Sequence, residues 1–322
     1  MRTTDWVTRL VTSATVLGAP LVSCAQTPSS KDDTAAVRVH SPSVVGDLRL
    51  HKFTSKIFGN TRYLRVLLPD GYDSAANSTR HYTVLYLADG QNLFDPATSV
   101  FGPSEWKVDE TVHDLITSGR IPPMIIVGVD NSGREARAHE YLPWPDTAVA
   151  HEYPAYDRDP QGKRYPDFLI NEVMPYINAR YRTLSDPAHT AIGGSSYGGL
   201  ISTYVVIARP GVFGRLLSES PTYWVYGSQI IADARHVAMW PDRVYMGVGT
   251  NEGGPAGCKP TDPPLAGDQM VPGVRQLETL LRSDGLDSSR LRVVVVQCGI
   301  HTHAAWAARL PNALTFLFAQ RP

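Results

Sequence analysis

The sequence lacks the features that mark several classes of protein. Its 30 Lys and Arg residues nearly balance 31 Asp and Glu residues, so the formal net charge is −1 and nothing favours a nucleic-acid partner. Its ten His residues form no H-E-x-x-H motif, which excludes zinc proteases of that type. It has only three cysteines and no CxxC pair, so neither a disulfide-rich scaffold nor a cysteine zinc site is indicated.

The sequence also has no hydrophobic run long enough to span a bilayer. The apolar stretch 10–23 is too short for this, follows Arg2 and Arg9, and ends in the letters LVSC at residues 21–24. Such a pattern is typical of a signal peptide, and LVSC is similar to a bacterial lipobox, in which the cysteine is lipidated. We therefore expect residues 1–24 to be a signal peptide with Cys24 as the lipidation site. Simple cleavage after Ala25 is the alternative.

Export would determine how the protein contacts a membrane and whether its cysteines can be oxidised. We expect a periplasmic or membrane-anchored lipoprotein, or a secreted protein, whose only membrane contact is the N-terminal lipid. Cys258 and Cys298 remain after processing, and two cysteines in an oxidising compartment can form a disulfide. Two separate buried thiols are equally compatible with the sequence, because the distance between them is not known from it.

Strands and helices are expected to alternate after a polar tether at 25–45. Near-continuous apolar runs, such as YTVLYLA (82–88) and MIIVGV (124–129), are typical of strands that are covered on both faces. The predicted strands are 48–55, 62–68, 82–88, 124–129, 189–193, 212–217, 243–248 and 291–296, and the predicted helices are 109–118, 167–181 (kinked at Pro175), 200–208, 274–283 and 304–318. This order predicts an α/β fold in one domain, 46–322, with a mostly parallel central sheet and helices on both faces.

The strongest local motif is Gly194-Ser195-Ser196-Tyr197-Gly198, which has the form G-x-S-x-G. A serine nucleophile needs a sharp turn between a strand and a helix, and the two glycines allow the backbone to pack closely there. A predicted strand precedes this motif and a predicted helix follows it. We therefore expect Ser196 to be a nucleophile. Ser195 is the weaker candidate, because it breaks the two-sided glycine spacing.

A serine nucleophile needs a histidine base and a carboxylate that orients it. In α/β-hydrolases these groups follow the serine in the order acid, then histidine. His236, His301 and His303 follow Ser196, and we favour His301 because it comes first after the last predicted strand.

The acid is expected after the strand 243–248, where Glu252 comes first. The rival carboxylates are Glu219, Asp262 and Asp268.

Two backbone amides are expected to stabilise the oxyanion that forms on the substrate. The first belongs to Tyr197, directly after the nucleophile. The second is assigned to Gln91, in the loop after the strand 82–88, where Gly90 allows a sharp turn.

Five segments of the sequence occur in an order that resembles a known family. They are LYLADGQNLFD (85–95), IIVGVDNSGREARAHEYLPW (125–144), GGSSYGG (193–199), GTNE (249–252) and GIHTHAAW (299–306). Across roughly residues 45–320 the chain resembles the esterase family of α/β-hydrolases that includes esterase D-like enzymes, siderophore esterases, feruloyl and acetyl-xylan esterases and mycolyltransferases. The resemblance implies Ser196 as nucleophile, Glu252 as acid and His301 as base.

The resemblance also places the region after the strand 124–129 beside the substrate cleft. We therefore expect Arg134, Arg137 and Tyr141 to contact substrate, and Trp224 to line an acyl or aromatic pocket. A solvated charged loop and a core tryptophan are the alternatives. The family often has Gly-His-Asp where this chain has Ile300-His301-Thr302, and Met or Leu where it has Tyr197, so the pocket is expected to differ.

Together these features predict an exported serine carboxylic ester hydrolase that works through an acyl-enzyme on Ser196 without a metal or an organic cofactor. The expected substrate is a small-molecule or glycan-linked ester, and siderophore lactones, feruloylated or acetylated polysaccharides and short-chain esters all remain open. One alternative is an acyltransferase with the same triad. Another is a non-catalytic exported binding protein on a hydrolase scaffold, and a peptidase is a weaker one. The sequence does not predict the oligomeric state.

Overall fold

The computed structural model describes residues that belong to the unit Thr34–Pro322. It covers residues 36–133, 136–145, 159–254, 257–259, 261–262, 265 and 268–320. The predicted signal peptide 1–24, with Cys24, lies outside the described residues, as does the tether up to residue 35. None of the helices in the described ranges has the length and hydrophobicity that crossing a membrane requires.

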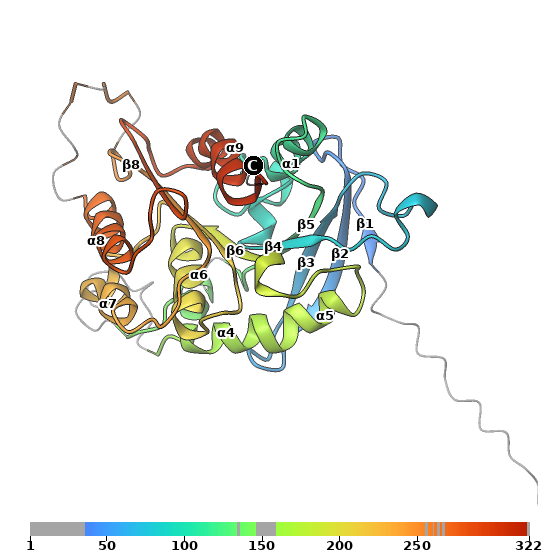
Figure 1. Cartoon of the computed structure of the whole chain (residues 1–322), viewed down its shortest axis with the longest axis horizontal. Helices are drawn as coiled ribbons and strands as arrows, with labels where there is room; N and C mark the ends of the chain where they lie inside the picture. Colours follow the sequence, from blue (N-terminus) through green and yellow to red (C-terminus); the bar gives the residue numbers. More distant parts are fainter. Residues whose placement is uncertain are drawn as a thin grey trace, which may run out of the picture. The chain divides into compact units, whose positions relative to one another are not determined.

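A single sheet of nine strands, counted over the described residues, forms the centre of the molecule (Figure 1). The strands are β1 (Val37–Arg38), β2 (Asp47–Thr54), β3 (Thr61–Leu68), β4 (Thr83–Ala88), β5 (Met124–Val129), β6 (Thr190–Ser195), β7 (Arg215–Glu219), β8 (Arg243–Gly249) and β9 (Leu291–Val296). Their order across the sheet is β1-β2-β3-β5-β4-β6-β7-β8-β9. The pairs β1–β2, β2–β3 and β3–β5 are antiparallel, and all other neighbours are parallel.

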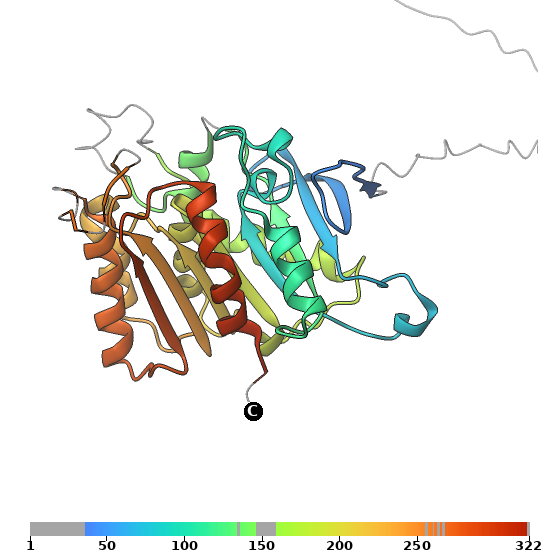
Figure 2. The ribbon, with the colours of Figure 1, turned by 90° about the horizontal axis from the view of Figure 1, so that it is seen from above.

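Helices cover both faces of the sheet, as Figures 1 and 2 show. The helices are α1 (Val108–Thr117), α2 (Ala136–Tyr141), α4 (Tyr165–Asp167), α5 (Met174–Asn178), α6 (Tyr197–Ala208), α7 (Val225–Ala234), α8 (Met270–Ser283) and α9 (His303–Phe318). A π-helical segment, η5 (Phe168–Val173), joins α4 to α5, and short 3₁₀ turns lie at η1 (Ala75–Asn77), η2 (Gly90–Asn92), η3 (Pro96–Thr98), η4 (Gly162–Arg164) and η6 (Pro187–His189). Helices α1 and α9 lie on one face, and α5, α6 and α8 lie on the other.

The apolar runs of the central strands explain this three-layer arrangement. Successive side chains of a strand point to opposite faces. In β4, Val84 and Tyr86 join the core beneath α5 and α6, whereas Leu85 and Leu87 join the core beneath α1 and α9. A strand that is apolar at every position therefore requires helices on both sides. The prediction of an α/β fold with a mostly parallel, doubly covered sheet is confirmed.

The expected tether extends too far into the folded region. Val37 pairs with Leu50 across β1 and β2, and the amide of Val39 donates to the carbonyl of Leu48 at 2.8 Å. Val39 and Val44 also pack against the core beside α1 and α9. The folded chain therefore begins before residue 46, because these valines add apolar contacts and edge pairing within an otherwise polar stretch.

Candidate active site

Ser196 occupies a strained turn between β6 and α6. Its φ of 58° and ψ of −126° are rare for a residue with a side chain, and such strain is found mainly at functional sites. A Cβ on Gly194 would lie 2.6 Å from the carbonyl carbon of Gly198, and one on Gly198 would lie 3.1 Å from Oδ2 of Asp89. Close packing against backbone therefore excludes a side chain at position 194, and position 198 leaves little room for one, which accounts for the G-x-S-x-G spacing.

The loops after β8 and β9 bring a carboxylate and a histidine together. Nδ1 of His301 lies 2.8 Å from Oε2 of Glu252, and the Glu252 side chain is only 1% exposed. A histidine whose Nδ1 is held by a carboxylate keeps its Nε2 for proton exchange with a nucleophile. His301 and Ser196 line the same pocket, so the structure places the expected nucleophile, base and acid at one site.

Glu252 is held as a carboxylate by its hydrogen bonds. Burial raises the pKa of Glu252, but hydrogen bonds from His301, Ser220 and the amide of Gly249 outweigh burial, and the net pKa is lowered. The hydroxyl of Ser220 donates to Oε1 at 2.6 Å, and the Gly249 amide donates to the same oxygen at 2.5 Å. Glu252 therefore carries a negative charge at neutral pH that can stabilise a histidinium.

The rival residues have other partners. Glu219 pairs with Arg309 at 2.7 Å, and Asp268 accepts from the amides of Glu252 and Met270. Asp262 accepts from the amide of Lys259. His303 lies 2.8 Å from the carbonyl of Ser104, so its Nδ1 donates there, and the exposed His236 does not line the pocket.

Ser220 is a positioning residue that the sequence did not reveal. Its Oγ accepts from Nε1 of Trp306 at 2.9 Å and from Nη2 of Arg309 at 3.0 Å, and it donates to Glu252. Its φ of 42° directs the chain after β7 toward this network. Two donors from α9 therefore orient the hydroxyl that holds the acid.

Replacing Ser220 by alanine is expected to lower kcat/KM about 10- to 100-fold, because a buried carboxylate loses one donor. Loss of that donor raises the pKa of Glu252, so the acidic limb of the pH profile moves to higher pH. Steady-state kinetics as a function of pH measure both effects. Ser218→Ala is the matched control, since its hydroxyl bonds Tyr223 at 2.9 Å instead of the acid. An unshifted acidic limb in Ser220→Ala would exclude this role.

The loops that carry acid and base are joined directly. Cys258 and Cys298 form a disulfide with Cα atoms 5.4 Å apart, which settles the pairing that the sequence left open. The amide of Asn251 donates to the carbonyl of Gly299 at 3.0 Å, beside the acid and the base. The relative position of Glu252 and His301 therefore depends on links between the two loops as well as on the pairing of β8 with β9.

A pocket of about 270 Å³ contains Ser196 and His301. Its other lining residues are Asp89, Asn92, Leu93, Phe101, Ser104, Trp106, Arg137, Ser195, Thr302, His303 and Trp306. Aromatic side chains thus face the nucleophile, while Asp89 and Arg137 supply polar groups. A second hollow of about 410 Å³ on the other side of His301 is lined by Trp224, Thr222 and Leu265, among others.

The structure changes the roles expected for the substrate-binding residues. Tyr141 is 0% exposed, and its hydroxyl accepts from the amide of Asp89 at 3.1 Å, so its prediction as a substrate contact is wrong: it fixes the turn after β4. Arg137 lines the pocket, but its Nε and Nη2 donate to Asp89 at 2.8 and 2.7 Å. Trp224 donates to Sδ of Met270 at 3.2 Å. Arg134 lies outside the described residues.

The two expected oxyanion donors lie on the elements that flank the nucleophile. Tyr197 is the first residue of α6, whose positive N-terminal end suits a developing negative charge. Gln91 lies in η2, after the left-handed Asp89 with φ 60°. The amides of Asn92 and Leu93 bond the carbonyls of Asp89 and Gly90, whereas no acceptor for the Gln91 amide is found among the described residues. Neither Tyr197 nor Gln91 is among the pocket-lining residues, so this assignment stays a prediction.

Comparisons with known proteins identify the family of the chain. The family model described as "Putative esterase" matches residues 55–317. The chain is 23% identical over 275 residues to the uncharacterized protein YbbA of Bacillus subtilis, covering 85% of this chain and 97% of that protein. It is 27% identical over 180 residues to a siderophore triacetylfusarinine C esterase of Aspergillus fumigatus, covering 55% of this chain and 56% of that one.

A solved structure with the same fold is the IroE-like serine hydrolase of Shewanella oneidensis, with a TM-score of 0.63 at 20% identity over 84% of this chain and 80% of that one. The family match spans most of the folded domain, and the chain belongs to this esterase family of α/β-hydrolases. It is a carboxylic ester hydrolase.

Proposed function

We propose that the protein hydrolyses esters through an acyl-enzyme formed on Ser196. The observation that carries this proposal is the 2.8 Å contact between His301 and the buried Glu252, in a pocket that also holds the strained Ser196. Nε2 of His301 takes the proton of Ser196 as its oxygen attacks the ester carbonyl, and the same proton passes to the leaving alcohol. Water then attacks the acyl-enzyme by the reverse proton path.

The other groups of the site stabilise the charges that form during the reaction. Glu252 orients His301 and stabilises its cationic form, because its hydrogen bonds keep it ionised. The amides of Tyr197 and Gln91 receive the oxyanion of the tetrahedral intermediate. No step in this scheme requires a metal or an organic cofactor.

The substrate class proposed is an ester with an aromatic group, such as a catecholate siderophore or a feruloyl ester. Phe101, Trp106 and Trp306 line the pocket and offer ring faces and edges to an aromatic group. The related protein of Aspergillus fumigatus is described as a siderophore esterase, which supports a siderophore ester as one candidate, whereas the preference for an aromatic group rests on the pocket lining.

Export is proposed on two grounds. The N-terminal sequence has the pattern of a signal peptide ending at Cys24, and Cys258 and Cys298 are joined by a disulfide, a bond that persists in oxidising compartments.

Covalent labelling with a fluorophosphonate, combined with hydrolysis assays, tests the function. We expect one label per chain, located by peptide mass spectrometry on Ser196, and hydrolysis of p-nitrophenyl esters. Faster cleavage of a feruloyl or catecholate ester than of an acetyl ester is expected from the aromatic lining. A label on Ser195 would contradict the assigned nucleophile. The absence of both labelling and hydrolysis would contradict the proposed mechanism and favour a binding protein.

A further inference from the structure

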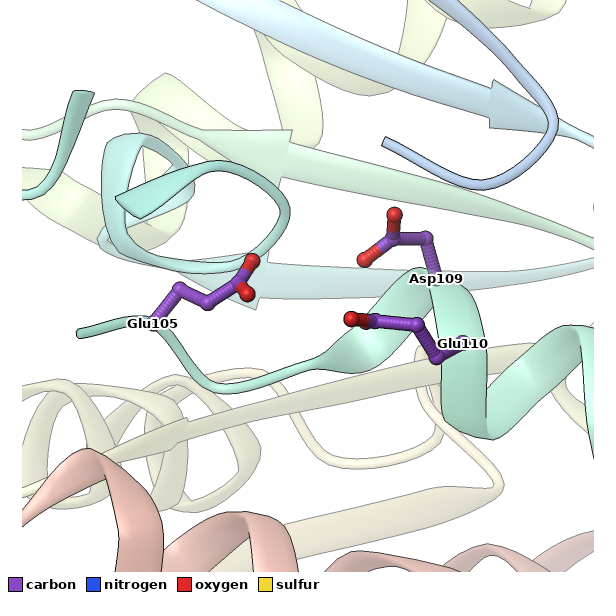
Figure 3. A group of neighbouring side chains, drawn as sticks. All are labelled: Glu105, Asp109 and Glu110. Carbon is purple, nitrogen blue, oxygen red and sulfur yellow. The ribbon is translucent and has the colours of Figure 1, made fainter. Parts of the chain in front are cut away.

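Three carboxylates converge at the start of α1. Glu105 lies on the loop before the helix, and Asp109 and Glu110 lie in its first turn. Figure 3 shows the three side chains directed toward one space, and one oxygen from each lies within 4.8 Å of the other two. Lys107, with a left-handed φ of 55°, turns the chain so that Glu105 faces the helix.

Two carboxylates of this cluster are buried, and three of its oxygens have no hydrogen-bond partner among the described residues. Asp109 is 0% exposed and Glu105 is 6% exposed. Oδ1 of Asp109 and the Oε2 atoms of Glu105 and Glu110 are buried without a partner, as judged over the residues that the structure describes. The amide of Val45 donates to the other oxygen of Asp109 at 2.7 Å. Buried polar atoms without partners are rare in folded proteins, and each one points to a missing ligand, water or proton.

The neighbouring positive charge pairs with Glu110 at the exposed edge of the cluster. Nζ of Lys107 lies 3.7 Å from Oε1 of Glu110, and its side chain is 62% exposed. Burial, together with the neighbouring Glu110, raises the pKa of Glu105 to about 7 and that of Asp109 to about 8. These groups therefore either hold protons or bind a cation.

We propose that Glu105, Asp109 and Glu110 bind one hard divalent cation, with Ca²⁺ preferred. All the ligand atoms are carboxylate oxygens, which Ca²⁺ and Mg²⁺ select over softer metals. Oxygens on opposite sides of a Ca²⁺ ion lie about 4.8 Å apart, since each bond is about 2.4 Å. Three oxygens that lie within this limit of one another can share one Ca²⁺ ion, whose coordination shell is flexible, whereas Mg²⁺ requires a near-ideal octahedron.

The cation would stabilise one wall of the active-site pocket and take no part in ester cleavage. Ser104 and Trp106 flank Glu105, and both line the pocket. Trp106 packs edge-to-face against Trp306 with ring centroids 6.0 Å apart, and the carbonyl of Ser104 accepts from His303. A cation bound to Glu105 therefore fixes the segment that places an aromatic ring opposite Ser196. This proposal does not depend on the proposed reaction.

Calorimetric titration of the chelator-treated full-length protein with CaCl₂ tests the site directly. We expect one Ca²⁺ per chain, and a melting temperature about 5 °C higher when Ca²⁺ is 100-fold above its Kd. Terbium gives an independent readout: Tb³⁺ at this site is excited through Trp106 and displaced by Ca²⁺. Absence of heat, of a thermal shift and of Tb³⁺ luminescence, at up to about 10 mM cation, would overturn the proposal in favour of bound protons.

Glu105→Gln and Asp109→Asn are expected to weaken Ca²⁺ binding at least about tenfold, because each removes a charged ligand. Asp114→Asn is the matched control, because it removes the same charge from an exposed position of α1. If Asp109→Asn does not fold, terbium luminescence of Glu105→Gln alone tests whether these carboxylates bind the cation. Equal Ca²⁺ affinity in Glu105→Gln and Asp114→Asn would contradict the ligand assignment.

Discussion

Replacing Ser196 by alanine is expected to lower kcat/KM for a p-nitrophenyl ester by about 100,000-fold or more. The alanine cannot form the acyl-enzyme, and the residual rate comes from the oxyanion donors and from substrate binding. Continuous assay of p-nitrophenol release, with enzyme concentrated enough to detect the residual rate, measures the change. The melting temperature is expected to stay nearly constant, since alanine keeps the same backbone conformation and the Ser196 hydroxyl makes no hydrogen bond within the described part of the chain.

Ser195→Ala provides the comparison for this variant. Ser195 is 6% exposed and ends β6, so its side chain is close to the site but is not at the tip of the turn. We expect its kcat/KM to remain within about tenfold of the original value. Comparable losses in both variants would mean that the turn was disturbed rather than a nucleophile removed.

His301→Gln is the second large effect, with an expected loss of about 10,000-fold in kcat/KM. The variant loses the group that removes the proton of Ser196, and leaves Glu252 without its 2.8 Å partner. Fluorophosphonate labelling of Ser196 is expected to slow by a similar factor, because it needs the same base. Stopped-flow or discontinuous labelling assays distinguish this from a binding defect.

His303→Gln tests the choice between the two histidines that follow the last strand. Its ring donates to the carbonyl of Ser104, and burial lowers its pKa, so it is held neutral against the pocket wall. A loss of no more than about tenfold is expected. If His303→Gln were the more damaging change, the base would have to be reassigned.

The turn at Ser196 and the sheet could be predicted from the sequence because each follows from local rules. Apolar runs such as Met124–Val129 can exist only between two layers, and β5 has the predicted bounds. Gly194 and Gly198 flank the serine because any side chain would collide with the neighbouring backbone or with Asp89. The expected acid precedes the expected base in the sequence because each follows one of two successive parallel strands. Both strands end at the same edge of the sheet.

Other features depend on contacts between distant residues and leave no local pattern. Tyr141 and Arg137 were both expected at the substrate. Tyr141 instead holds the backbone of Asp89, whereas Arg137 does line the pocket but forms an ion pair with the Asp89 carboxylate. The link from Ser220 to Trp306 spans 86 residues of sequence. Spacing in one sequence identifies polar side chains near a strand end, but it does not distinguish those that meet substrate from those that support the site.

The disulfide between Cys258 and Cys298 links the positions of Glu252 and His301 to the oxidation state of the chain. It closes a segment of 40 residues whose two ends lie close to the acid and the base. In a chain with both thiols reduced, strand pairing and single hydrogen bonds hold Glu252 against His301, and the cross-link no longer limits the conformations of the segment between the two cysteines. We therefore expect the reduced esterase to be less active than the oxidised one.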